Sequence, residues 1–324
     1  MPMEFDLIEI IRARTASTRA DVRIGIGDDA AVLAPPAGHE LVATTDTLVE
    51  HVHFPIATRP EDIGWKALAV NLSDLAAMGA TPAWAMLALT LPSAEREFVE
   101  RFADGFAALA AQHHVALIGG DTTKGPLAVT VSAFGFVPPG KALLRSGARA
   151  GDLVFVTGTV GDAAAGLRFP FEGLFQNAAS SDACDALRAR LDRPTPRVAA
   201  GIVLRGRASA CIDVSDGLLA DVGHIAGQSG VGVEIAASSL PASPALLQAF
   251  DAPERLLYQA AGGDDYELVF TLPRADEAAV MRDLSKIGCG ATRIGRVVDG
   301  AGVRLLDAQG REIAITRRGW DHFA

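Results

Sequence analysis

The sequence predicts an α/β (α+β) fold in two domains, and three observations lead to this prediction. The chain has 324 residues, 49% of them apolar and 33 of them glycine, so it can bury a large core and exceeds most single domains in length. Short apolar runs alternate with segments of helical spacing in both halves. Residues 135–152 concentrate glycine, proline and basic residues, which is typical of a linker. We therefore predict an N-terminal α+β domain, residues 1–138, and a C-terminal α/β domain, residues 139–324.

The N-terminal half predicts a mixed sheet with an order of the βαβ type. Residues 5–14 carry apolar side chains at helical spacing and predict an amphipathic first helix. Apolar runs then predict strands, and the longer segments between them predict helices. The predicted strands are residues 41–44, 83–91, 115–118 and 127–136, and the predicted helices are residues 62–78 and 93–113.

The C-terminal half alternates again and predicts a second layered structure. Its predicted strands are residues 153–156, 210–213, 231–235, 267–272, 293–298 and 303–306. Its predicted helices are residues 161–169, 182–191, 197–205, 217–227 and 276–286.

The net charge of −10 argues against a nucleic-acid partner. Proteins that grip nucleic acid through its phosphates usually show a basic patch, and no cluster of lysine and arginine of that kind is present. A polyphosphate ligand would therefore need a divalent metal between itself and this chain.

Cysteine usage and hydropathy indicate a cytoplasmic protein. The cysteines, Cys184, Cys211 and Cys289, are far apart and odd in number, which favours a reducing compartment. The first ten residues, MPMEFDLIEI, carry acids where a secretory signal needs positive charge. The uncharged run at residues 75–94 is long enough to span a bilayer, but Pro82 and Pro92 argue for a turn and a buried strand instead.

Aspartates recur in six motifs, each of which places an acid after an apolar run and a small residue. The motifs are GIGDDA (Asp28, Asp29), VATTDTL (Asp46), VNLSDLAAMG (Asp74), LIGGDTTKG (Asp121), CIDVSDGLLAD (Asp213, Asp216) and AGGDDYELVF (Asp264, Asp265). Strand ends that deliver carboxylates to a shared edge give hard cations such as Mg²⁺ their oxygen ligands. Neighbouring glycines let backbone or phosphate approach closely. The pattern predicts several metal ions rather than one.

Each acid also has a purely structural interpretation, because Asp and Gly are common turn residues and Ser and Asp are common helix caps. Asp28, Asp221 and Asp265 fit that interpretation, and Ser73 and Ser215 fit as caps. Recurrence favours function: NLSDL and DVSDG are each followed 47 or 48 residues later by GGD. This spacing indicates either an internal duplication or a chance match.

Other catalytic motifs are absent. Residues 135–142, GFVPPGKA, have the spacing of a P-loop, but Ala142 stands where a hydroxyl should hold Mg²⁺ and two prolines remove backbone N–H donors. Neither a GxSxG elbow nor an HExxH pair occurs. His113 and His114 end a predicted helix, whereas His51 and His53 follow Asp46 in a loop and are better candidates for ligand contact.

Taken together, the ordered motifs resemble the thiamine-monophosphate kinase family. The motifs are GIGDDAAVL, TTDTLVEHVHF, KALAVNLSDLAAMGATP, IGGDTTKGP, LLRSGA, DVSDGL, GGDDYEL and GWDHF, and they run from about residue 5 to the C-terminus. This family is part of the ATP-binding superfamily that includes aminoimidazole ribonucleotide synthetase and selenophosphate synthetase.

The resemblance implies a two-domain fold like that of aminoimidazole ribonucleotide synthetase, with an N-terminal domain that binds ATP and metal. It implies transfer of the γ-phosphoryl of ATP to thiamine monophosphate, giving thiamine diphosphate and ADP. Several Mg²⁺ ions would assist, ATP would be the co-substrate, and the enzyme would be a homodimer.

The resemblance also assigns roles to residues. Metal ligands would be Asp29, Thr44, Thr45, Asp46, Asp74, Asp121, Asp213 and Asp216, with Asp46, Asp74, Asp121 and Asp213 acting in catalysis. The nucleotide would contact Gly120, Asp121, Arg145 and Ser215. The thiamine substrate would contact His53, Asp264 and Trp320. Asp264 stands where the family often has Glu in GGEDYE, which changes the reach of that contact.

The chemistry of phosphoryl transfer fits these residues independently of the resemblance. Two phosphates repel, so catalysis needs alignment and charge neutralisation more than a strong base. Arg145 would add positive charge. Trp320 would stack on the cationic thiazolium, a contact worth roughly 0.5–2 kcal/mol, although a packing residue near a chain end is the simpler interpretation.

Two alternatives remain at this point. A sister ATP-dependent synthetase would act on another small substrate, but selenophosphate synthetase typically needs a reactive cysteine near its N-terminus, and none precedes Cys184. A non-catalytic metal-binding protein would show metal-dependent melting without ATP turnover.

Overall fold

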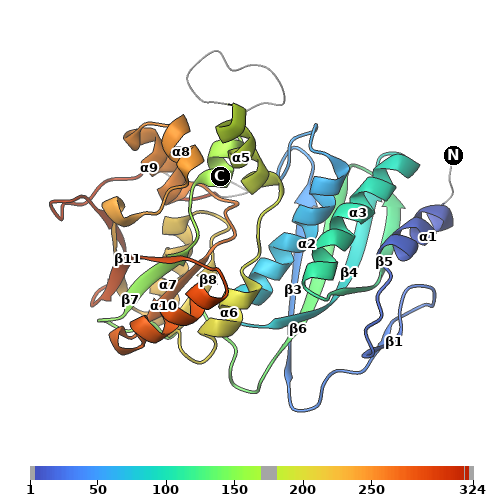
Figure 1. Ribbon diagram of the computed structural model, residues 1–324, viewed down its shortest axis with the longest axis horizontal. Helices are drawn as coiled ribbons and strands as arrows, with labels where there is room; N and C mark the ends of the chain where they lie inside the picture. The colour runs from blue at the N-terminus through green and yellow to red at the C-terminus, as the bar shows by residue number, and fades with distance from the viewer. Residues whose placement is uncertain (1–3, 169–180, 317, 321–324) are drawn as a thin grey trace. The chain divides into compact units, whose positions relative to one another are not determined.

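The computed structural model describes residues 4–168, 181–316 and 318–320, which form two compact units (Figure 1). Unit 1 comprises Met1–Leu75 and Ala80–Gly140, and unit 2 comprises Ala76–Gly79 and Lys141–Ala324. In the described part of the chain, no helix combines the length and the apolar character needed to cross a membrane.

Unit 1 is built on a four-stranded sheet in the order β3-β6-β4-β5. The strands are β3 (Glu40–Val49), β4 (Thr81–Leu91), β5 (Ala116–Lys124) and β6 (Ala128–Val137). β4 and β5 are parallel, while β6 is antiparallel to both of its neighbours. The sheet is therefore mixed, as the sequence predicts.

Two helices, α2 (Pro60–Ala77) and α3 (Arg96–Gln112), make the crossovers from β3 to β4 and from β4 to β5. Figure 1 shows them side by side over one face of the sheet, with α1 (Glu4–Arg14) beside β5. The two crossover helices meet at glycines: a Cβ added to Gly105 would lie 1.8 Å from the carbonyl oxygen of Glu61. The close approach fixes α2, which carries Asp74, against the rest of the unit.

The opposite face of this sheet is only partly covered. A short antiparallel pair, β1 (Val22–Ile24) and β2 (Val32–Leu33), packs against Trp84 and Phe136, whose rings meet edge to face at 5.0 Å. Leu41 and Met86 remain 56% and 42% exposed. This open face is a surface on which polar strand residues can remain in water.

Two strands of unit 1 extend well past their predicted ends. The predicted strand 41–44 continues to Val49, and the predicted strand 115–118 continues to Lys124. Asp46 and Asp121 therefore lie inside strands, and the expectation that both follow a strand end is wrong. The reason is that β3 and β5 are the two edge strands of the sheet, where polar residues can complete one ladder of hydrogen bonds and still contact water.

Unit 2 contains a six-stranded sheet in the order β12-β9-β11-β7-β10-β8. The strands are β7 (Leu153–Thr157), β8 (Ala210–Asp213), β9 (Gly232–Ala236), β10 (Leu268–Leu272), β11 (Ala291–Val298) and β12 (Gly302–Leu306). Only the β9–β12 pair is parallel. All six strands match predicted ones within a few residues.

One face of this sheet forms the main core of unit 2. Val154, Ile212 and Ile235 pack there with Leu219 and Ile225 of α7 (Leu218–Ser229). Phe155 of β7 and Phe270 of β10 are not part of this cluster, and their rings stack with centroids 5.5 Å apart. The core places the start of α7 beside the end of β8.

The remaining helices of unit 2 are short. They are α4 (Asp162–Gly166), α5 (Ser181–Asp192), α6 (Val198–Leu204), α8 (Pro244–Ala249), α9 (Ala252–Ala261) and α10 (Glu277–Lys286), with 3₁₀ turns η1 (Ala237–Ser239) and η2 (Arg274–Asp276). The predicted helix 161–169 ends at Gly166, and residue 169 lies outside the described residues. Helices α8 and α9 were not predicted.

Candidate active site

The acids of unit 1 form one close pair. Thr44 Oγ1 donates a hydrogen bond to Asp74 Oδ2, which ties α2 to β3. Asp46 is two residues farther along β3, so it projects from the same face of the sheet as Thr44. Burial and the nearby carboxylate of Asp74 raise the pKa of Asp46 to about 6. Thr44, Asp46 and Asp74, three of the predicted metal ligands, are therefore brought together.

The strand register separates this pair from Asp121. Asp46 is aligned with Val131, Leu87 and Gly120 across the sheet, and three strand spacings put its backbone about 14 Å from that of Gly120. Asp121, one residue on, points to the opposite face, where it is exposed. Thr45 also projects from that face, so two predicted ligands lie across the sheet from Asp46.

A small hollow of about 60 Å³ lies beside Asp121. Its lining residues are Ile8, Ile11, Ile26, Leu87, Leu117, Gly119, Gly120, Asp121 and Thr122. Gly120 has φ +156, and a Cβ there would lie 1.8 Å from the carbonyl oxygen of Leu87. Only glycine allows this strand contact, and the result is an apolar hollow bordered by one carboxylate.

The other predicted residues of unit 1 lie in loops. Asp28 and Asp29 are exposed between β1 and β2, and the Asp29 N–H donates to Asp28 Oδ1 at 2.9 Å, so Asp28 has the predicted turn role. His53 Nδ1 accepts from the Val49 N–H at 3.0 Å, which orients the ring. Its carbonyl oxygen accepts from Nζ of Lys66, a lysine only 2% exposed.

In unit 2 the DVSDG motif makes the turn from β8 to α7. Asp213 is the last residue of β8 and is 3% exposed. Its carboxylate is therefore at a strand end, as predicted. Asp221 Oδ2 accepts from the N–H groups of Ser215, Asp216 and Gly217 at 3.1, 3.2 and 3.1 Å. Burial and the carboxylates of Asp213 and Asp216 hold the pKa of Asp221 well above its usual range. Asp221 thus stabilises the turn that contains Ser215 and Asp216.

Two further motifs meet at the same turn. The Asp264 N–H donates to the Ser215 carbonyl oxygen at 2.8 Å, and Asp264 adopts a left-handed conformation with φ 68. The Trp320 N–H donates to the Asp216 carbonyl oxygen at 2.8 Å. The structure therefore gathers Asp213, Ser215, Asp216, Asp264 and Trp320, while residues 321–323 of the GWDHF motif lie outside the described residues.

Arg145 is not part of this group. Its carbonyl oxygen accepts from Ser229 Oγ at the C-terminal end of α7. Ser215 precedes the N-terminal end of the same helix, so the length of α7, about 18 Å, separates the two backbones. Of the predicted residues in unit 2, only Arg145 lies away from the turn.

Sequence reasoning missed a buried ionic network behind Asp264. Glu267 is fully buried and accepts from Thr157 Oγ1 at 2.6 Å, from Arg190 at 2.8 Å and from Arg197 through two nitrogens at 2.6 Å each. Asp162, 1% exposed, lies 3.8 Å from Arg190 Nε. The only signal in the sequence is the acid in YELVF, directly before a strand.

Asp265, the next residue in the motif, caps α4. Its carboxylate accepts from the Gly161 N–H at 2.6 Å and from the Ala163 N–H at 3.3 Å. Complete burial outweighs these donors and Arg190, and it raises the pKa of Asp265 to about 8. The structural role proposed for this acid from sequence agrees with this geometry.

The pKa of Asp265 predicts a pH dependence of stability. Because the folded-state value lies above the ordinary 3.8, folding favours the protonated acid, and its contribution to stability is lost as pH rises toward about 8. Asp265→Asn removes this titration. Urea unfolding from pH 5 to pH 9 should therefore show a smaller loss of stability in the variant than in the parent chain. Parallel curves would contradict a raised pKa at this site.

The predicted metal ligands are distributed over these separate groups. Among residues 4–168, 181–316 and 318–320, no three His, Cys, Asp or Glu side chains are close enough together to hold a metal ion. The structure instead provides a carboxylate pair at Asp46 and Asp74, and it places Asp213 and Asp216 near the buried Asp221 at the DVSDG turn.

Comparison with known proteins places the chain in a family. Residues 27–137 match the AIR synthase related protein N-terminal domain, and residues 149–308 match its C-terminal domain. The thiamine-monophosphate kinase of Salmonella typhimurium is 45% identical over 322 residues, covering 99% of this chain and 98% of the relative. The chain belongs to the thiamine-monophosphate kinase family.

Solved structures of this family agree with the fold. A crystal structure of thiamine-monophosphate kinase from Stenotrophomonas maltophilia K279a superposes with a TM-score of 0.88 at 51% identity, over 96% of this chain and 98% of that one. A structure described as AaThiL complexed with AMPPCP and TMP superposes with a TM-score of 0.77 at 35% identity, over 100% and 99% of the two chains. The predicted two-domain fold is thereby confirmed.

Proposed function

We propose that this chain is a Mg²⁺-dependent thiamine-monophosphate kinase. It transfers the γ-phosphoryl group of ATP to thiamine monophosphate and releases thiamine diphosphate and ADP. The observation that carries the proposal is the full-length match to thiamine-monophosphate kinases, joined by a 35% identical structure described as a complex with AMPPCP and TMP.

The reaction fits a site without a strong base. An oxygen of the acceptor phosphate forms a bond to the γ-phosphorus, and the bond from that phosphorus to the oxygen bridging to the β-phosphate breaks. The acceptor oxygen is already deprotonated near neutral pH, so no proton has to be removed before attack. The chain must chiefly hold two anions in line.

The carboxylate pairs fit Mg²⁺. Asp46 and Asp74 are near enough to raise the pKa of Asp46, and a hard cation between two such carboxylates relieves their repulsion. Bound there, Mg²⁺ would neutralise phosphate charge. Asp213 and Asp216, with Asp29, complete the proposed carboxylate ligands.

More than one ion fits the register of the sheet. Thr44 is on the same face as Asp46, whereas Thr45 and Asp121 are on the other face. Asp121 therefore fits an ion different from the one at Asp46, with phosphate oxygens completing each ligand set.

We propose separate contacts for the nucleotide and for thiamine monophosphate. The proposed nucleotide contacts are Gly120 and Asp121, which border the apolar hollow, and Ser215. Arg145 lies at the far end of α7 from Ser215, so it would contact the nucleotide only if its side chain extends toward that end. Trp320 is 49% exposed at the turn that carries Asp216 and Asp264, which suits a stacking contact with thiamine. His53 completes the proposed thiamine contacts.

A homodimer in the cytoplasm is part of the same proposal. The partly uncovered face of the unit 1 sheet, with Leu41 and Met86 exposed, suits contact with a second copy. All three cysteines are unpaired and buried, which fits a reducing compartment. Light scattering should give twice the chain mass.

An assay of ADP release across acceptors tests the activity. With ATP and Mg²⁺, purified protein should release ADP when thiamine monophosphate is added and remain near the background rate with free thiamine or with no acceptor. Faster turnover with free thiamine would overturn the acceptor assignment. A metal-dependent rise in melting temperature without ADP release would favour a non-catalytic metal-binding protein instead, and turnover only with another small substrate would favour a sister synthetase.

A further inference from the structure

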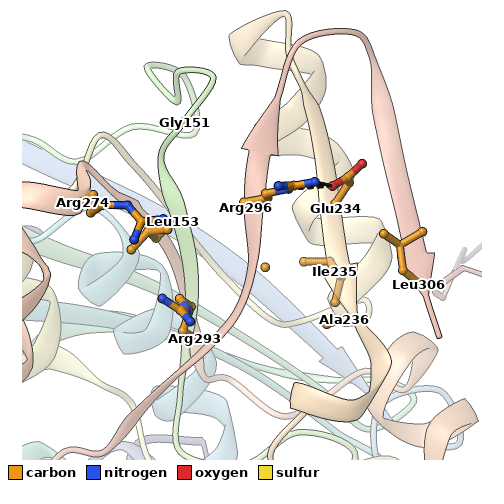
Figure 2. Close-up of a pocket in the computed structure, with 10 residues that line it drawn as sticks. Gly151, Leu153, Glu234, Ile235, Ala236, Arg274, Arg293, Arg296 and Leu306 are labelled. Atoms are coloured by element: carbon orange, nitrogen blue, oxygen red, sulfur yellow. Dashed lines mark hydrogen bonds and ion pairs between the residues drawn. The ribbon is translucent and has the colours of Figure 1, made fainter. Parts of the chain in front are cut away.

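A larger pocket, of about 540 Å³, lies in unit 2 at a distance from the DVSDG turn. Its lining residues come mainly from β7, β9 and β11 (Figure 2). Asp213 is aligned with Leu268 at one end of β10, whereas Leu153 in the pocket is aligned with Leu272 at the other end. Four residues of strand, about 13 Å, separate these two levels. The pocket is therefore not an extension of the candidate active site.

Arginine dominates the charge of this pocket. Arg274, Arg293 and Arg296 line it, and the one acid that lines it is Glu234. Glu234 accepts from Arg296 Nε at 2.8 Å and also pairs with Arg304. Figure 2 shows Arg296 extended toward Glu234. This carboxylate is thus already shared by two arginines and does not neutralise Arg274 or Arg293.

Arg274 and Arg293 carry the positive charge of the pocket that Glu234 does not neutralise. Figure 2 shows both side chains on the side of the pocket away from Glu234, with Arg274 next to Leu153 and Arg293 farther along the strands. Arg293 has a long ion pair with Glu277, 3.8 Å, and the Arg274 side chain forms no hydrogen bond or ion pair with the described residues. An anion in the pocket can accept charge-assisted hydrogen bonds from guanidinium groups on this side. Their setting in a chain of net charge −10 makes this local excess of positive charge more distinctive.

The rest of the pocket lining is mainly apolar. Leu153, Ala236 and Leu306 supply apolar side chains. Gly295 lies between them, and a Cβ at that position would be 2.0 Å from the carbonyl oxygen of Glu234. Pockets of roughly 300–1,000 Å³ with apolar walls and a few polar groups are typical of small-molecule sites.

We propose that this pocket is a second ligand site that binds a phosphate-bearing small molecule, with Arg274 and Arg293 holding the phosphate. Guanidinium groups match the planar, bidentate geometry that phosphate oxygens prefer. The apolar walls would accept the organic part of the molecule. Inorganic phosphate and a nucleotide such as ADP both offer phosphate oxygens to the arginines. Only the nucleotide also has an organic part that can contact the apolar walls.

Arginine footprinting on the full-length protein tests the site directly. The protein is treated with an arginine-specific dicarbonyl reagent at constant ionic strength, alone or with inorganic phosphate, ADP or a single-stranded oligonucleotide, and each arginine is read by mass spectrometry. Phosphate or ADP should slow the modification of Arg274 and Arg293 severalfold and leave Arg311, an exposed arginine paired with Asp307, unchanged. If ADP protects these arginines at a lower concentration than phosphate does, the nucleoside part of ADP contributes to binding through the apolar walls. Unchanged rates with both, or protection by the oligonucleotide alone, would overturn the proposal.

Substitutions provide an independent readout. The double variant Arg274→Ala/Arg293→Ala should weaken calorimetric phosphate binding at one site about tenfold or more. Arg311→Ala, which removes an exposed arginine that does not line the pocket and pairs with Asp307, should leave that affinity unchanged. Equal affinities in the parent chain and the double variant would contradict the proposal. Because neither readout uses turnover, the result is independent of the kinase assignment.

Discussion

Asp46→Asn is expected to lower the rate of ADP release by more than about a hundredfold while the protein stays folded. The amide keeps the size of the side chain but removes the negative charge that a cation needs. It also removes the repulsion with Asp74 that contributes to the raised pKa of Asp46. The melting temperature without metal should therefore be equal to or higher than that of the parent chain. The measurement is a steady-state assay with saturating ATP and thiamine monophosphate, paired with thermal melting.

Two comparisons sharpen this prediction. Asp74→Asn should show the same loss, because it supplies the other carboxylate of the pair. Asp104→Asn, on the exposed surface of α3 where Asp104 pairs with Arg14, should keep the parental rate. A near-normal rate in Asp46→Asn would show that this carboxylate is not a ligand.

Glu267→Gln is expected to destabilise the protein by about 3–5 kcal/mol, because it removes the buried counter-charge of Arg197 and leaves Arg190 only the more distant Asp162. Glu267 is fully buried directly before β10 and forms ion pairs with Arg190 and Arg197. Gln keeps the shape and can still accept a hydrogen bond, so the loss reports the charge. The measurement is the free energy of unfolding from urea titration.

The matched control is Glu9→Gln, in an exposed pair with Arg12 on α1. Screening by water makes such a pair nearly neutral for stability, so its unfolding curve should overlay that of the parent chain. If Glu267→Gln also overlays the parent curve, the buried network does not support the Asp264 loop.

Much of the fold follows from local pattern, and the exceptions have physical causes. In unit 2, β7 and β10 are fully buried apolar runs, which hydropathy detects. The later parts of β3 and β5 are rich in threonine, glycine and aspartate, and they are strands only because a neighbouring strand completes their ladders. Helices α8 and α9 are short, yet both carry readable caps: Ser243 accepts from the Leu246 N–H and Asp251 from the Glu254 N–H, each at 3.0 Å.

The candidate site was predictable as a set of motifs but not as an arrangement. Sequence spacing cannot show that Asp46 and Asp121 project from opposite faces, since that depends on strand register. It also cannot show that the chain segment at Trp320 returns to the turn at Asp216, because no local rule links residues so far apart. The network around Glu267 depends on arginines 70 and 77 residues away.

We propose that two groups of carboxylates, Asp46 with Asp74 and Asp213 with Asp216, bind the metal ions that neutralise the phosphate charge. Binding of Mn²⁺ in place of Mg²⁺, followed by electron paramagnetic resonance with a non-hydrolysable ATP analogue and thiamine monophosphate present, tests it most directly. The account predicts tight Mn²⁺ binding in the parent chain and in Asp104→Asn, and clear loss of bound ion in both Asp46→Asn and Asp213→Asn. Equal Mn²⁺ binding in all four proteins would contradict it.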